Sequence, residues 1–109
     1  MGGREYLGEF EQVVLLALVR IGAPAYGAAI HQEILDATGR DVSIPAVYVT
    51  LKRMERKGLV SSKVEAPAGG GRAKRNYTLL TAGEQALARS RTLLESLWSG
   101  TAVGTEEPA

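Results

Sequence analysis

The chain has 109 residues, a net charge of +1 and no cysteine, and 45% of its residues are hydrophobic, which fits a single globular domain. Disulfides and thiol chemistry are therefore excluded, the single histidine, His31, argues against a histidine-rich metal site, and we expect no cofactor. The longest apolar run, Val13–Val19, is too short to span a bilayer and the first residues lack the layout of a signal peptide, so we predict a cytoplasmic protein.

Two apolar helices are predicted in the first third of the chain. The first covers about 8–21 and ends at Gly22. Its apolar residues occupy most of the helix circumference, so we expect it to be buried on more than one side. After a short connection, the second helix is predicted over about 26–38, with Gly39 closing it.

The third predicted helix, from about 43 to 57, has two different faces. Ser43 is a suitable N-cap because its hydroxyl can accept a free N–H of the first turn, where Pro45 loses no hydrogen bond. The face expected to point to the core carries Ile44, Val47, Leu51 and Met54. The opposite face carries Pro45, Val49, Lys52, Arg53 and Arg56. Tyr48 lies at the border, where it can pack on the core, contact a phosphate, or do both.

Beyond Gly58 the pattern changes from helical to β. Two short β-prone runs, 59–65 and 75–81, flank a loop with three consecutive glycines, so we predict a hairpin with a long flexible tip. Thr81 and Glu84 then have the spacing of a capping box, and we predict a fourth helix that ends near Trp98.

The charge is concentrated in one part of the chain. Residues 1–51 carry three basic and six acidic residues, residues 52–91 carry ten basic and three acidic residues, and residues 92–109 carry three acidic residues. A segment of net charge +7 therefore lies inside a nearly neutral chain, as a focused contact with a polyanion requires.

The predicted order of elements is helix, helix, helix, hairpin, helix, which is a mainly α chain with a small β-hairpin. Two short helices followed by a capped helix with a positive outer face indicate a helix-turn-helix, and the hairpin adds a wing. Such a third helix fits the major groove of B-DNA, and a basic hairpin suits phosphate or minor-groove contacts. The sequence thus predicts a winged helix-turn-helix protein that binds double-stranded DNA.

Four segments in this order resemble the PadR-type transcriptional regulators. They are LGEFEQVVLLAL at 7–18, AYG at 25–27, AVYVTLKRMERKGLV at 46–60 and RNYTLLTAGEQAL at 75–87, and the resemblance extends over about residues 7–98. It implies a winged-helix homodimer, from a bacterium or archaeon, that acts as a repressor on a palindromic operator. It also implies that the first half of the third helix reads bases while the wing contacts the DNA backbone.

Transferred residue by residue, the resemblance assigns DNA contacts to the third helix and to the wing. Those on the helix are Ser43, Pro45, Ala46, Tyr48, Val49, Thr50 and Arg53. Those on the wing are Lys63, Arg72 and Lys74. The helical wheel adds Lys52, and the basic wing adds Arg75. Because the base-facing positions lack the Arg, Asn or Gln of bidentate base contacts, we expect thymine-methyl contacts and DNA shape to carry part of the specificity.

The fourth helix resembles the short C-terminal dimerisation helix of the family. The apolar stripe that we expect at the dimer interface consists of Leu87, Leu94, Leu97 and Trp98. Two copies would bury this stripe against the first helix and place two half-sites about one DNA turn apart. An alternative interpretation places Trp98 in an aromatic-lined pocket for a small-molecule effector between the subunits.

The expected organisation is therefore a winged-helix DNA-binding domain over 1–80, a dimerisation helix over 81–100 and a disordered tail over 101–109. A winged-helix module that binds proteins and not DNA is a second hypothesis, because the net charge is near zero and the outer face of the third helix is partly apolar. An enzyme is the most distant hypothesis, because the chain has no cysteine, one histidine and no recognisable pair of catalytic carboxylates.

Overall fold

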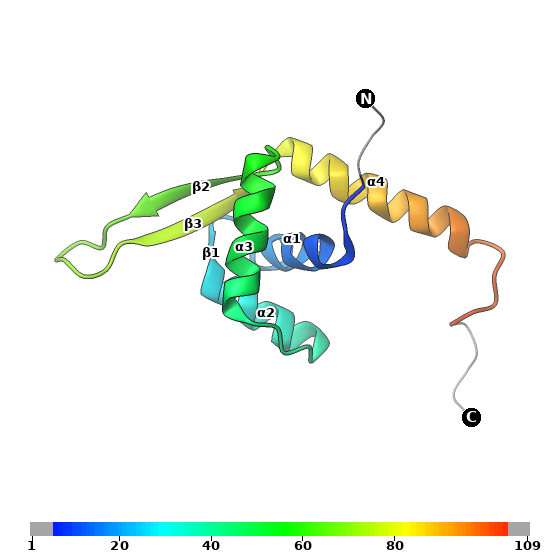
Figure 1. Ribbon diagram of the computed structural model, residues 1–109, viewed down its shortest axis with the longest axis horizontal. Coiled ribbons are helices and arrows are strands. Elements are labelled where there is room, and N and C mark those ends of the chain that lie inside the picture. Colours follow the sequence, from blue (N-terminus) through cyan, green and yellow to red (C-terminus); the bar gives the residue numbers. More distant parts are fainter. Residues whose placement is uncertain (1–5, 105–109) are drawn as a thin grey trace.

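Four α-helices and three short β-strands make up the part of the chain that the computed structural model describes, residues 6–104 (Figure 1). In chain order they are α1 (Glu9–Ile21), β1 (Ala25–Tyr26), α2 (Gly27–Thr38), α3 (Ile44–Arg56), β2 (Val60–Glu65), β3 (Lys74–Leu79) and α4 (Thr81–Trp98). The predicted order of helices and hairpin is confirmed, and each helix begins and ends within two residues of its predicted bounds. Of the predicted tail, residues 101–104 form no helix or strand, and 105–109 lie outside the described residues, as do residues 1–5 of the predicted first domain.

The start of α3 and the end of α2 follow from local hydrogen bonds. The hydroxyl of Ser43 accepts the N–H of Ala46 at 3.1 Å, as predicted for an N-cap. Gly39 adopts a left-handed conformation with φ of 73°, and its N–H donates to the carbonyl oxygen of Leu35 at 2.8 Å. The connection between the two helices is therefore set by its own residues.

The capping box predicted for α4 is wrong. Leu80 is the N-cap, no side chain caps the helix, and Thr81 is already its first helical residue. The backbone explains the difference, because the N–H of Leu80 donates to the carbonyl oxygen of Leu59 at 3.0 Å. This bond ties the end of the hairpin directly to the start of the helix, so α4 begins one residue earlier than the box requires.

The sheet has three antiparallel strands in the order β1-β3-β2. The hairpin pairs Val60 with Leu79 at its base and Glu65 with Lys74 near its tip, and it extends from the helices as a long arm (Figure 1). Strand β1 was not predicted, because a strand of two residues has no alternation that a sequence pattern can reveal.

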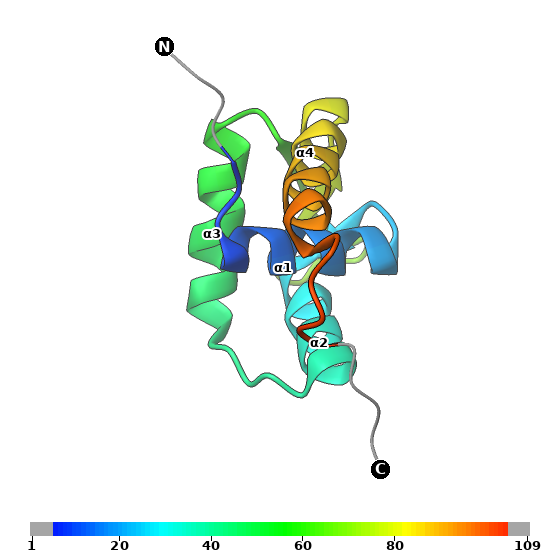
Figure 2. The ribbon, with the colours of Figure 1, turned by 90° about the vertical axis from the view of Figure 1, so that its right-hand side faces the viewer.

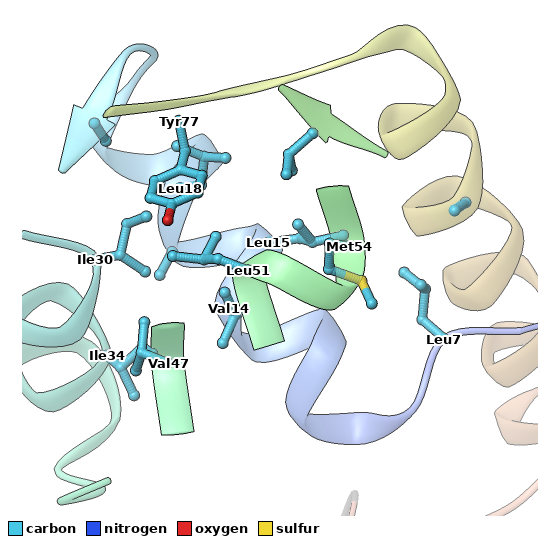
Figure 3. Packing of buried hydrophobic residues seen from close by; sticks show 14 residues of the cluster. Leu7, Val14, Leu15, Leu18, Ile30, Ile34, Val47, Leu51, Met54 and Tyr77 are labelled. Carbon is cyan, nitrogen blue, oxygen red and sulfur yellow. The ribbon is translucent and has the colours of Figure 1, made fainter. Parts of the chain in front are cut away.

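The core lies between α1, α2, α3 and the base of the sheet (Figure 3). The largest fully buried side chains are Val14, Leu15, Leu18, Ile30, Ile34, Val47, Leu51, Met54 and Val60. The prediction that α1 is buried on more than one side holds only in part, because Leu16 and Val19 remain half exposed. Ile44 was expected in the core and is 45% exposed, because it lies in the first turn of α3, at the end of the helix.

Two glycines allow elements to approach more closely than any side chain would permit. A Cβ atom at Gly83 would overlap the carbonyl oxygen of Leu59, where α4 crosses the start of the hairpin. A Cβ atom at Gly27 would overlap the ring of Tyr48, where α2 meets α3. Both glycines belong to the sequence segments that carry the family resemblance, and close packing is the physical reason for each.

Candidate nucleic-acid interface

Helix α3 lies along one outer edge of the molecule, which leaves one of its faces open to solvent (Figure 2). Val47, Leu51 and Met54 bury the opposite face in the core. The outward side chains are those of Pro45, Val49, Lys52 and Arg56, as the helical wheel predicted, whereas Arg53, predicted on the same face, is only partly exposed and pairs with Glu11 of α1. This outer face is therefore apolar near the N-terminus of α3 and positively charged further along.

Three of the residues predicted to contact bases, Thr50, Ala46 and Ser43, offer less to a partner than the sequence suggested, and for Thr50 the side chain is buried. Thr50 is only 3% exposed, because it lies within 60° of Val47 on the helix and points into the core, so its prediction as a DNA contact is wrong. Ala46 is half-buried, and the Ser43 hydroxyl already accepts a backbone N–H. The N-terminal half of α3 therefore exposes fewer of the predicted contact side chains than the sequence suggested.

Tyr48 joins α3 to the N-terminus of α2. Its ring packs against Gly27 while the residue remains 39% exposed. Packing against a neighbouring helix and contact with a partner are therefore compatible for this side chain. The phosphate contact stays a prediction.

Arg53 is tied to a carboxylate that sequence reasoning missed. Its Nε lies 3.1 Å from Oε2 of Glu11, and Nζ of Lys57 lies 3.5 Å from the same oxygen. The other oxygen of Glu11 accepts the N–H of Gly8 at 2.9 Å. A signal was present in the sequence, because Glu11 shares the apolar face of α1 with Leu18, and an acidic residue on a core face needs partners.

The predicted wing residues Lys63, Arg72, Lys74 and Arg75 are all exposed. Two acidic residues that were not expected at this site, Glu65 and Glu55, form hydrogen bonds that hold parts of the wing in place. The hydroxyl of Tyr26 donates to Glu65 at 2.9 Å, and this bond raises the pKa of that phenol above its ordinary value. The ammonium of Lys74 lies 5.5 Å from the centroid of the Tyr26 ring, within the range of a cation–π contact.

A hydrogen-bonded chain connects the other side of the wing to α3. Arg75 donates through Nη1 to the hydroxyl of Ser62 at 2.8 Å, and that hydroxyl donates to Oε2 of Glu55 at 2.7 Å. The middle of the hairpin is therefore linked to α3 by polar contacts, in addition to the core packing at its base.

A basic groove of about 440 Å³ lies between the N-terminus of α2, the exposed edge of α3 and the wing. The groove is lined by Tyr26, Ala28, Ala29, Tyr48, Arg72, Ala73, Lys74 and Arg75. Three of these eight residues are cationic and none is acidic. The structure thus brings four of the predicted contacts, Tyr48, Arg72, Lys74 and Arg75, to one concave surface, while Lys63 lies outside it on β2.

The apolar stripe of α4 is divided between the core and solvent. Leu87 packs against the core, whereas Leu94, Leu97 and Trp98 are exposed, with Leu97 at 67%. A groove of about 600 Å³ runs between this stripe and Leu16 of α1. In the described part of the chain, no helix is both long and apolar enough to cross a membrane.

Comparisons with known proteins agree on fold and family. The model of the PadR-like family of transcriptional regulators matches residues 14–89. A PadR family regulator from Eggerthella lenta is 22% identical, with 92% of this chain and 88% of that chain covered and a TM-score of 0.69. The structure of hsRosR-S1, solved as a complex, is 25% identical, with 88% of this chain and 80% of that chain covered and a TM-score of 0.68.

A third solved structure, F93 from STIV, is described as a winged-helix DNA-binding protein. It is 16% identical, with 88% of this chain and 98% of that chain covered and a TM-score of 0.67. No curated protein sequence matches the chain. The fold is therefore a winged helix, and the family match extends over most of it. The chain belongs to the PadR-like family and is a transcriptional regulator, not an enzyme.

Proposed function

We propose that this protein is a homodimeric repressor that binds a palindromic operator, with α3 in the major groove and the wing on the DNA backbone. The observation that carries the proposal is the basic groove between Tyr48 and the wing, directly beside the exposed face of α3. An element that enters a groove of DNA and a cationic surface beside it are the two parts that base reading and backbone positioning require.

Base reading is assigned to the outer N-terminal face of α3. The side chains on this face are Pro45, Ala46 and Val49, with Ser43 and Tyr48 at its edges. These groups offer apolar contact to thymine methyl groups and no bidentate hydrogen bond. Sequence-dependent DNA shape therefore supplies part of the specificity in this proposal.

Backbone contacts are assigned to the groove and to the cations around it. The first turn of α2 lines the groove with Ala28 and Ala29, and Tyr26 makes no side-chain cap there. Free amides at a helix N-terminus together with nearby cations suit a phosphate group. The cations assigned to this role are Lys52, Arg56, Lys63, Arg72, Lys74 and Arg75.

The homodimer is proposed from the exposed stripe of α4. Leu94, Leu97 and Trp98 are exposed on α4, and Leu94 and Trp98 line the groove between α4 and α1. A second copy related by two-fold symmetry would cover both the stripe and the groove. In this arrangement the segment up to residue 80 binds DNA and α4 dimerises. The same groove, with Trp98 at its rim, is where a small-molecule effector would bind. Because a repressor acts on chromosomal DNA, we place the protein in the cytoplasm.

Selection of bound duplexes from a random pool tests the proposal. We expect enrichment of a palindrome whose half-sites are separated by about one helical turn. The affinity for the selected duplex should fall linearly on a log–log plot against salt, with a slope of about −0.9 for each phosphate contacted. A pool without an enriched motif, and binding that does not depend on salt, would instead favour the protein-interaction module.

A further inference from the structure

Glu11 is an internal counterion for two cations of the DNA-binding helix. Its residue is only 8% exposed, and Oε2 pairs with both Arg53 and Lys57, at 3.1 and 3.5 Å. We propose that Glu11 withholds these two cations from DNA phosphates and thereby lowers the affinity of the protein for DNA of any sequence. The inference rests on the proposed function, because it concerns how α3 divides its charges between the protein and DNA.

Arg53 and Lys57 lie where they could contact DNA if Glu11 did not hold them. Arg53 and Lys57 lie on the flank of α3 that faces α1, and their side chains remain 42% and 36% exposed. Arg53 is one helical turn from Val49 on the outer face, so its side chain could reach a backbone phosphate if it were released. Lys52 and Arg56, by contrast, have no ion pair among the described residues.

The buried position of Glu11 explains why the carboxylate would keep its partners in the presence of DNA. A carboxylate that has left water depends on its pairing, and removing the partners would leave an unpaired charge inside the protein. Phosphates on DNA remain hydrated and screened by counterions. The competition for Arg53 and Lys57 therefore favours Glu11.

Limiting these charges has a defined consequence for binding. Sequence-independent affinity grows with the number of phosphates that the protein neutralises, whereas base contacts discriminate between sequences. A third helix that offers two free cations, and not four, loses affinity for all DNA equally. The ratio between operator and random DNA is preserved while the absolute affinity stays moderate.

The test compares Glu11→Gln with the wild type on a scrambled-sequence duplex over a series of salt concentrations. Glutamine keeps an oxygen for the N–H of Gly8 and removes the charge that holds the cations. We expect tighter binding, and a log–log salt slope steeper by about 0.9 for one additional phosphate contact or about 1.8 for two. Circular dichroism before each titration verifies that the variant is folded.

A matched control separates released cations from a simple change of net charge. Glu33→Gln makes the same change in net charge and also breaks an ion pair, with Arg20 at 2.6 Å, but this pair joins α1 to α2 and does not involve α3. Its salt slope should equal that of the wild type. Equal slopes for Glu11→Gln and Glu33→Gln would overturn the proposal.

A second variant keeps the test decisive if Glu11→Gln does not fold. Arg53→Gln retains a hydrogen-bond donor for Glu11 and leaves the Lys57 pair in place. If Arg53 is withheld from DNA, this variant has the salt slope of the wild type, whereas a slope shallower by about 0.9 would show that Arg53 already contacts a phosphate and would overturn the proposal. Wild-type protein that shows no salt-dependent DNA binding would instead refute the proposed function itself.

Discussion

At the scale of single residues, Glu11 links the N-terminus of α1 to the C-terminal half of α3. Burial opposes ionisation of its carboxyl group, but the Gly8 N–H and the positive charges of Arg53 and Lys57 outweigh that effect and hold its pKa below the ordinary value of 4.5. The ionised form is therefore the one that the folded state prefers.

This preference makes the contribution of Glu11 to stability depend on pH. Because the folded-state pKa is lowered, the stabilisation is present above pH 4.5 and is lost as the pH falls through the lowered pKa. We expect Glu11→Gln to reduce the free energy of unfolding by about 1–3 kcal/mol at neutral pH, and the difference from wild type to shrink at acidic pH. Urea unfolding of both proteins at neutral pH and at about pH 3 measures this, and a difference that stays constant would contradict it.

Residue assignments could be predicted where they depend on neighbours in the chain. The Ser43 hydroxyl that caps α3 accepts the N–H of Ala46, which is only three residues away, so the role of Ser43 can be identified from the local sequence. The ion pair between Glu11 and Arg53 spans 42 residues, and no local pattern encodes it. Thr50 was assigned from the family resemblance, which does not show where the boundary between core and solvent lies on α3, and its side chain is buried.

At the scale of elements, α3 and the wing have separate roles in the proposed complex. The wing presents its cations at a hairpin tip, whereas the outer face of α3 is apolar where it would meet base edges. Both elements were predicted from periodicity and glycine content. The strand β1 and the polar links from Glu55 and Glu65 were not, because they depend on pairings between distant segments.

Replacing cations of the wing should weaken binding to all duplexes alike. We expect Arg72→Ala combined with Lys74→Ala to reduce the magnitude of the salt slope by up to about 1.8, with the order of preferred sequences unchanged. Val49→Ala should instead alter preference at one or two base positions, by on the order of 1 kcal/mol, and leave the slope unchanged.

Fluorescence anisotropy on a panel of single-base operator variants measures both effects. A suitable control is Arg20→Ala combined with Arg91→Ala, which removes the same charge from α1 and α4, where Arg91 pairs with Glu95. If this control flattened the salt slope as much as the wing variant, the binding would reflect net charge and not the wing.

At the scale of the whole molecule, the described chain is elongated and thin, with principal extents of 57 × 43 × 20 Å. The wing and α4 extend in opposite directions from the helical core, so the candidate DNA surface and the exposed stripe of α4 lie at different ends (Figure 1). The fold and family could be predicted from the chain alone. The homodimer was predicted only from the family resemblance and stays a proposal, because the side chains that would cover the stripe belong to a second copy.

Placing a charge in the α4 stripe should separate the subunits. Leu94→Glu would bury a carboxylate against apolar groups in the proposed dimer, and we expect the sedimenting mass to fall to that of one chain. Val64→Glu introduces the same charge at an exposed apolar residue of the wing and should leave the mass unchanged. A dimer that persists in Leu94→Glu would exclude this stripe as the interface.

The contact between Gly27 and Tyr48 also constrains how related sequences can diverge. The ring of Tyr48 occupies the space that any side chain at position 27 would need. Substitutions at the two positions should therefore be coupled over evolutionary time, with a residue larger than glycine at 27 found only where 48 has become small. If the aromatic ring at 48 is lost first, a side chain at 27 can follow without a steric overlap. If the side chain at 27 is gained first, it overlaps the ring of Tyr48 and the protein packs poorly until 48 also changes.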